Sequence, residues 1–235
     1  MLRSKIYLIL GIGTEIGKTF LVENLLRHPD LVSGSILPLA IKPIASGFCD
    51  DDKNSDTARI AKILGEKDFD KITPWRFKKP VSPHFAGKID FSAVKNFCRK
   101  NIALAKKQNR FLFIEAAGGV MTPITDKKTF LDLACDLKIP VLLVSANYLG
   151  SISHTLCAIM ALKAKKIFLE KIIINENFPS QIKTSQLVRT CPKSRCEEHS
   201  ESAIDGHRSR DFGQVLRTIE RFSNIQTISI KHFLQ

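Results

Sequence analysis

One stretch near the start of the chain, residues 5–19 (KIYLILGIGTEIGKT), constrains the fold more than any other. Its apolar run, IYLIL, is long enough for one buried strand. Gly11 and the GKT at 17–19 then follow as in the phosphate-binding pattern G-x-x-x-x-G-K-T, and apolar residues of 20–27 recur with helical spacing. A strand, a glycine loop and a helix in this order predict a phosphate-binding loop, because a chance match in an ordinary turn lacks these flanking elements.

The chemistry of this loop predicts a nucleotide site. Glycines allow backbone N–H groups to close around phosphate oxygens, and the helix that follows directs its partial positive end to the same place. Lys18 is expected to place its charge beside the β- and γ-phosphates, and the Thr19 hydroxyl is expected to bind magnesium.

Length and composition predict a globular protein with one α/β domain or two small ones, and we expect a single α/β domain over residues 1–235. Hydrophobic residues make up 44% of the chain, which can fill a sizeable core. The first strand begins within five residues of Met1, and no apolar run approaches the length of a membrane span. We therefore expect a cytoplasmic protein with no membrane partner, whose six cysteines are thiols.

The formal net charge of +13 is high for an enzyme that acts on small molecules. It would suit a nucleic-acid surface, but the lysines are spread along the chain in short runs such as 78–79, 106–107 and 165–166. This distribution favours a solvated basic face, and we predict no nucleic-acid partner.

Strand and helix patterns alternate along the chain. Buried strands are predicted at residues 38–44, 110–116, 140–146 and 169–175, and helices at 56–64, 90–107, 129–137 and 151–165. Residues 74–87 hold three prolines and are predicted to be irregular. Near-continuous apolar strands that alternate with helices predict an α/β fold of the P-loop NTPase type, with a doubly wound, mostly parallel sheet and helices on both faces.

The chain changes character from about residue 180. Residues 180–222 are polar and show no apolar periodicity, so we predict a surface insertion or a divergent segment there, followed by a closing strand at 225–230. Two cysteines and two histidines offer zinc ligands, but their spacing fits no established site, and accidental clustering is favoured for Cys191, Cys196, His199 and His207.

Three oxygen-bearing side chains are predicted to surround one hard cation: Thr19, Asp56 and Glu115. Asp56 begins a helix and could equally serve as its cap, whereas a carboxylate that closes an apolar strand, as Glu115 does, is better explained by metal or water positioning. Lys42, inside an apolar segment, is expected either to meet a phosphate or to extend its side chain to the surface.

Taken together, several segments resemble the dethiobiotin synthetase family over roughly the first three-quarters of the chain. The matching segments are GIGTEIGKT at 11–19, KPIASG at 42–47, NSD at 54–56, SPH at 82–84, EAAGG at 115–119, TP at 122–123, PVLLV at 140–144, LGSISH at 149–154 and IIN at 173–175. The phosphate loop alone would indicate only a nucleotide-binding superfamily. The segments KPIASG, EAAGG and LGSISH together are much more specific and indicate this family.

The resemblance implies a reaction and a set of site residues. 7,8-Diaminopelargonate, CO2 and MgATP would become dethiobiotin, ADP and phosphate. Lys42 would hold the carbamate and the γ-phosphate, Thr14 and Lys18 would stabilise charge on the transferred group, and Ser46 would bind the substrate.

The family works as a homodimer, in which the loop of Gly150, Ser151, Ile152 and Ser153 receives the distant substrate carboxylate from the other subunit. ATP and Mg2+ would contact Glu15, Ile16, Gly17, Lys18, Thr19, Phe20, Asp56, Glu115, Ala116, Ala117, Gly118 and Asn175, with Asn175 at the adenine.

Two rival functions belong to the same superfamily. A partitioning or positioning ATPase would suit the positive charge, but it typically carries a second lysine early in the phosphate loop, where this chain has Ile12 and Gly13. A related amide-forming synthase works with a glutaminase module, for which the chain has no room.

Overall fold

The computed structural model describes residues 2–32, 37–176 and 201–234, and for residues 201–211 it describes the backbone alone. The centre of the described chain is a sheet of six strands in the order β10-β9-β8-β1-β5-β2. All neighbouring pairs run parallel. The strands are β1 (Ile6–Gly11), β2 (Leu39–Ile41), β5 (Leu112–Glu115), β8 (Val141–Ala146), β9 (Leu169–Asn175) and β10 (Thr227–Ser229).

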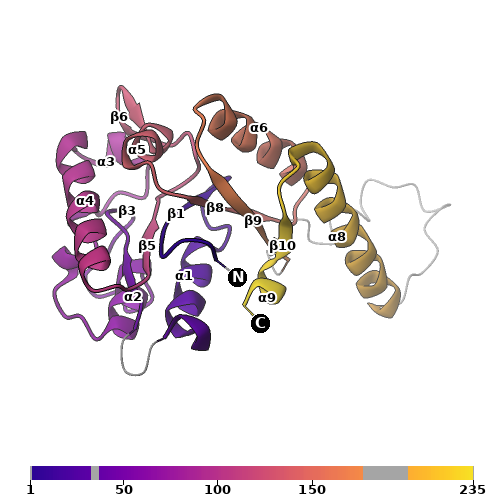
Figure 1. The fold of residues 1–235 in the computed structure, drawn as a ribbon, viewed down its shortest axis with the longest axis horizontal. Coiled ribbons are helices and arrows are strands. Elements are labelled where there is room, and N and C mark those ends of the chain that lie inside the picture. The colour runs from indigo at the N-terminus through magenta and orange to yellow at the C-terminus, as the bar shows by residue number, and fades with distance from the viewer. Residues whose placement is uncertain (1, 33–36, 177–200, 235) are drawn as a thin grey trace.

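Helices cover both faces of this sheet (Figure 1). The side chains of β1 alternate between two cores, with Tyr7 and Ile9 in one and Leu8 and Leu10 in the other. The first core is closed by α1 (Lys18–Arg27), α2 (Asp56–Leu64) and α9 (Ile230–Phe233). The second is closed by α4 (Phe91–Lys107), α5 (Phe130–Leu137), α6 (Ser151–Ala164) and α8 (Glu201–Ser223). The predicted doubly wound parallel fold is confirmed.

Parallel pairing places the functional ends of the strands at one edge. Gly11 closes β1, Glu115 closes β5 and Asn175 closes β9. Glu115 lies level with Ile9 in the register. Because the carboxyl ends of parallel strands meet at the same edge, the phosphate-binding loop and these polar side chains share one region of the molecule.

Local capping explains why α2 has the predicted bounds. The Ser55 hydroxyl accepts a hydrogen bond from the Ala58 N–H (3.3 Å), so Ser55 is the N-cap and Asp56 is the first helical residue. Gly65 ends the helix in the left-handed conformation (φ 65°). Because Ser55 serves as the cap, the Asp56 carboxylate is not used for capping and can contact other elements.

Two predictions in residues 38–87 are wrong. The strand predicted at 38–44 is two strands, β2 and β3 (Ile44–Ser46), because the Lys42 N–H leaves the main sheet to bond Ile72 O (3.1 Å) and Pro43 has no N–H. The segment predicted to be irregular forms β4 (Trp75–Phe77), parallel to β3, and the one-turn helix α3 (Pro83–Ala86). The remaining short elements are η1 (Pro29–Leu31), η2 (Phe69–Lys71) and the antiparallel pair β6 (Pro123–Thr125) and β7 (Lys128–Thr129).

The predicted insertion at about 180–222 is wrong for its C-terminal part. Residues 201–223 form α8, and Ile219 is fully buried against the second core. Phe212, Val215 and Leu216 also pack on that core. The side chains of the two cysteines and two histidines for which accidental clustering is predicted, at 191, 196, 199 and 207, lie outside the described part of the chain. β10 follows α8 and pairs with β9, which confirms the predicted closing strand.

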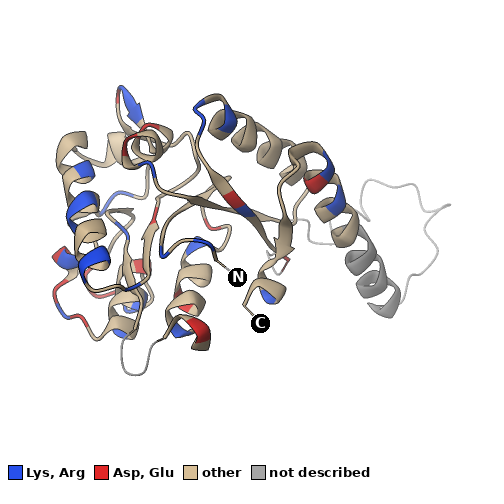
Figure 2. Ribbon diagram, viewed as in Figure 1, with Lys and Arg blue, Asp and Glu red and all other residues tan. Residues whose placement is uncertain are grey.

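Charged residues are distributed over several helices. Figure 2 shows Lys and Arg along α4, at one end of α6, on the described part of α8 and on connecting segments. No helix in the described ranges is both long enough and apolar enough to cross a membrane. Cys49, Cys98, Cys135 and Cys157 are free thiols, as predicted for them.

We predict that Ile219→Ala lowers the free energy of unfolding by roughly 3 kcal/mol, because it removes a fully buried side chain from the core. Urea denaturation measures this loss. Gln214→Ala, at an exposed position of the same helix, should change stability by no more than about 0.5 kcal/mol. Equally small losses for both variants would mean that α8 is a detachable insertion after all.

Candidate active site

The phosphate-binding loop joins the end of β1 to the start of α1. Five residues, and not four, separate Gly11 from Gly17, so the match to G-x-x-x-x-G-K-T is corrected to a loop one residue longer. The loop turns through left-handed backbone at Glu15 (φ 57°) and Gly17 (φ 104°). The Lys18 ammonium donates to Gly13 O (2.6 Å), and this hydrogen bond links the two ends of the loop.

Gly17 is required by close packing as well as by its backbone angle. A Cβ at this position would lie 2.6 Å from Asn175 Nδ2. The same Asn175 nitrogen donates to Ile16 O (3.2 Å), which fixes the end of β9 against the loop. The predicted adenine-binding residue thus lies directly on the phosphate-binding loop.

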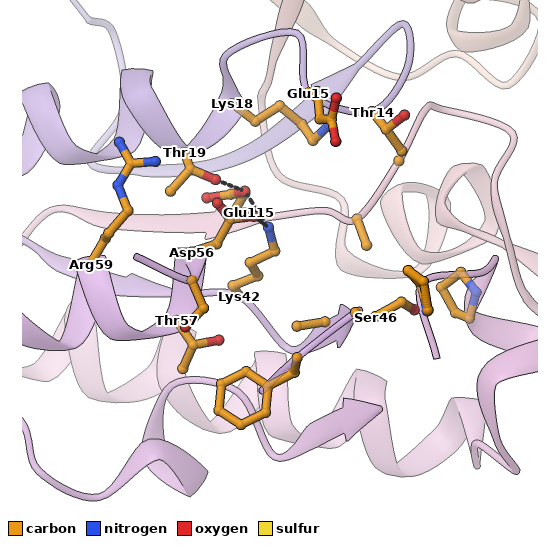
Figure 3. Close-up of a pocket in the computed structure, with 18 of the residues that line it drawn as sticks. Thr14, Glu15, Lys18, Thr19, Lys42, Ser46, Asp56, Thr57, Arg59 and Glu115 are labelled. Carbon is orange, nitrogen blue, oxygen red and sulfur yellow. Dashed lines mark hydrogen bonds and ion pairs between the residues drawn. The ribbon is translucent and has the colours of Figure 1, made fainter. Parts of the chain in front are cut away.

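A cavity of about 950 Å³ opens beside this loop (Figure 3). It gathers most of the residues predicted for the site from segments far apart in the sequence. They are Thr14, Glu15, Gly17, Lys18, Thr19, Phe20, Lys42, Ser46, Asp56, Glu115, Ala117, Gly118 and Asn175.

Lys42 lies at the centre of a buried ionic cluster. Its ammonium donates to Glu115 Oε1 (2.8 Å) and to Asp56 Oδ2, and the Thr19 hydroxyl donates to the same Glu115 oxygen (2.6 Å). Only 6% of Lys42 is exposed, so the alternative in which its side chain extends to the surface is wrong. Figure 3 shows Lys42, Asp56, Glu115 and Thr19 converging on one point of the cavity.

The cluster shifts the pKa values of its members. Burial by itself would lower the Lys42 pKa, but the attraction of Glu115 and Asp56 outweighs it and raises this pKa. Burial would raise the Asp56 pKa, but the Lys42 charge and its hydrogen bond lower it. Burial, with the Lys42 charge adding to it, lowers the pKa of Lys18 to about 8. Within the described residues no carboxylate forms an ion pair with Lys18 as Asp56 and Glu115 do with Lys42, so an anion beside it would be favoured.

The side chains present fit a magnesium ion. Glu115 Oε2 is buried and has no hydrogen-bond partner in the described chain, although a carboxylate oxygen in such a place needs one. Thr19, Asp56 and Glu115 supply the hydroxyl and carboxylate oxygens that Mg2+ prefers. The described residues hold no group of three or more His, Cys, Asp or Glu side chains placed for a metal. A magnesium site here would therefore combine two carboxylates with a hydroxyl and with oxygens from the nucleotide.

Ser46 is the second buried polar group without a partner. Its hydroxyl oxygen lies at the wall of the cavity, at the end of β3, and accepts or donates no hydrogen bond within the described residues. A hydroxyl in this position is available to a bound substrate.

Some predicted residues do not line this cavity. The side chains of Ile16 and Ala116 are buried in the cores. The segment Gly150–Ser153 lies at the start of α6, where the Ser151 side chain is buried and Ser153 is exposed. It adjoins a second cavity of about 480 Å³, lined by residues that include Thr14, Met121, Thr122, His154 and Cys157.

Arg59 also lines the main cavity and was not predicted. It lies three residues after Asp56 on α2, a spacing that places both side chains on one face of the helix. This spacing could have identified it. Its partner Glu23 comes from α1, which only the folded chain brings close.

Comparisons with known proteins show which family this chain resembles. The AAA domain family profile matches residues 5–229. The ATP-dependent dethiobiotin synthetase of Caulobacter sp. (strain K31) is 38% identical over 72% of this chain and 75% of its own length. Those of Caulobacter vibrioides (strain NA1000 / CB15N) and Legionella pneumophila (strain Corby) are 32% and 37% identical, covering 87% and 73% of this chain and 93% and 80% of their own.

Among solved structures, the MinC:MinD cell division protein complex of Aquifex aeolicus is similar to 96% of this chain over 81% of that chain, with a TM-score of 0.48 and 14% identity. This likeness is too slight to carry an argument about function. The sequence matches are extensive and close enough to identify the family. The chain belongs to the dethiobiotin synthetase family.

Proposed function

We propose that this protein is an ATP-dependent dethiobiotin synthetase, a ligase that joins CO2 to 7,8-diaminopelargonate and closes the ureido ring. A carbamate of the diamine attacks the γ-phosphorus of ATP and releases ADP. The second amine then attacks the carbonyl carbon of the mixed anhydride, and phosphate leaves. Family membership supports this reaction, and the buried Lys42 in the cavity beside the phosphate loop is the observation that carries it.

Lys42 suits this chemistry because it is a buried cation, held beside the phosphate loop by contacts to Asp56 and Glu115. Phosphoryl transfer relies on positioning and on charge stabilisation more than on a protein nucleophile. The ammonium of Lys42 would orient the carbamate and the γ-phosphoryl group, and its attraction would grow as negative charge moves between them. Lys18 and Thr14, from the loop itself, would stabilise the same charge.

Magnesium would be held by Thr19, Asp56 and Glu115 together with phosphate oxygens. When bound, it neutralises phosphate charge and orients the terminal phosphates. Lys42 contacts both carboxylates of this set, so its side chain must share them with the metal or move toward the phosphoryl group.

A homodimer would complete the substrate site. Ser46 would bind the diamine end of the substrate, and the start of α6 from a second copy would receive the distant carboxylate, since a helix N-terminus favours an anion. The exposed apolar side chains Met121, Leu149 and Met160 lie on or near the segments around the second cavity and suit burial between copies. A cytoplasmic location stays a prediction from the sequence.

The proposed function predicts phosphate release that depends on both 7,8-diaminopelargonate and bicarbonate, with dethiobiotin formed in equal amount. Coupled phosphate detection and mass spectrometry measure the two products on the purified protein. Omitting the diamine should reduce phosphate release to the background of the Lys18→Ala variant. ATP hydrolysis at the same rate without the diamine would instead indicate a nucleotide switch.

Lys42→Gln should reduce turnover by at least about a hundredfold, roughly 3 kcal/mol in barrier, while ATP affinity changes far less. The glutamine keeps much of the stem and deletes the charge, whereas Lys18, the loop amides and magnesium still bind the nucleotide. Steady-state kinetics and equilibrium ATP binding on one preparation, checked by circular dichroism, measure both effects. Lys171→Gln is the matched control, because Lys171 is also buried but donates to the Gln226 side chain far from the cavity. Loss of ATP binding in step with turnover would make Lys42 a general nucleotide ligand.

Ser46→Ala should raise the KM for the diamine about tenfold with a smaller change in kcat, because one neutral hydrogen bond to substrate is lost. Its stability should stay the same or increase, since the buried hydroxyl has no hydrogen-bond partner to lose among the described residues. Ser145→Ala is the control: its buried hydroxyl bonds Thr155 Oγ1 (2.7 Å), so stability should fall by about 1 kcal/mol while KM stays constant. An unchanged KM for Ser46→Ala would remove this residue from the substrate site.

A further inference from the structure

A second contact between α1 and α2 lies one helical turn beyond the proposed magnesium ligands. Glu23 follows Thr19 by four residues on α1, and Arg59 follows Asp56 by three residues on α2. These spacings place each pair on one face of its helix. The two helices thus meet first through Thr19 and Asp56 and then through Glu23 and Arg59.

The Glu23–Arg59 contact is bidentate. Arg59 Nε donates to Glu23 Oε1 (2.9 Å), and Arg59 Nη2 donates to Glu23 Oε2. Glu23 is buried, with 8% of its surface exposed, while the Arg59 guanidinium borders the cavity (Figure 3). Two parallel hydrogen bonds fix the relative orientation of the two groups, which a single contact would not do.

In the described chain, the first turn of α2 is held mainly by elements other than α1, since Asp56 pairs with the Lys42 ammonium. Thr57 faces Thr73, its hydrogen-bond partner (2.9 Å), and the apolar residues Ile60 and Ala61 belong to the next turn. The Asp56 carboxylate is 41% exposed, so burial alone does not hold it in place. The Lys42 ion pair holds the Asp56 carboxylate near Glu115, the partner of Thr19, and the Arg59 contact to Glu23 adds a direct bidentate link between α2 and α1 one turn further along.

We propose that Arg59 and Glu23 are positioning residues for magnesium, holding the start of α2 against α1 so that Asp56 and Thr19 face the same cation. This inference rests on the magnesium role in the proposed function. The pair carries no net charge, so it can act beside the cation by fixing geometry without repelling it. Partners that orient metal ligands commonly change metal affinity when they are removed.

The test measures how binding of a fluorescent ATP analogue depends on Mg2+ concentration, and how tightly the analogue binds in EDTA. Arg59→Met and Glu23→Gln should each weaken the apparent Mg2+ affinity by about tenfold or more, while binding in EDTA changes by less than about twofold. The double variant should lose no more than the larger single loss, because both changes remove one interaction. Arg59→Lys keeps the charge but not the bidentate geometry and should fall between wild type and Arg59→Met.

Lys95→Met is the matched control, because Lys95 Nζ pairs with Asp136 Oδ2 (3.2 Å) between α4 and α5, on the other face of the sheet. Its Mg2+ dependence should equal that of wild type. Thermal unfolding of every variant identifies any that fail to fold. If Arg59→Met does not fold, Glu23→Gln still tests the inference, because glutamine has nearly the same shape as glutamate.

The outcomes separate this inference from the proposed function. No Mg2+ dependence in the wild-type protein would overturn the magnesium role itself. A Mg2+-dependent wild type, with Arg59→Met and Glu23→Gln that keep the same dependence and lose only thermal stability, would overturn the positioning role. Weaker binding in EDTA for Arg59→Met, but not for Glu23→Gln, would make Arg59 a direct nucleotide ligand and would also overturn it.

Discussion

The buried ammonium of Lys42, shared between Asp56 and Glu115, is the interaction on which the site depends. The three side chains come from the segment after β2, the start of α2 and the end of β5, so the cluster joins separate parts of the fold. A lysine buried alone is unfavourable, and so is the fully buried Glu115 carboxylate beside the half-buried Asp56 carboxylate, but the opposite charges together are tolerated. A buried ionic cluster of this kind adds little net stability over an apolar one. What it provides is fixed charge at a defined place.

The parallel architecture could be predicted because its strands are buried on both faces, which leaves continuous apolar runs such as the one in β1. The bounds of α2 could be predicted because Ser55 and Gly65 are local signals. The convergence of Lys42, Glu115 and Asn175 followed from the rule that parallel strands end at one edge. The short strands β3 and β4 could not be predicted in this way, because each is stable only through the other.

The helix α8 shows a different limit of sequence analysis. Phe212, Val215, Leu216 and Ile219 do recur with helical spacing, but the polar residues before them hide the pattern in any window that starts earlier. The spacing of Arg59 from Asp56 could have pointed to it, but its contact with Glu23 could not be predicted, because Glu23 lies on a different helix. Local patterns specify elements well, whereas pairs between elements appear only once the chain is folded.

The two edges of the main sheet, β2 and β10, are each three residues long. Pro38 and Pro43 flank β2, and α9 begins directly after β10, so few unpaired backbone groups are offered along either edge. Short, proline-bounded edges disfavour the addition of a strand from another molecule. Copies of this chain should therefore assemble through side-chain surfaces and should resist edge-to-edge aggregation, even though the sheet between those edges is made of strongly apolar strands.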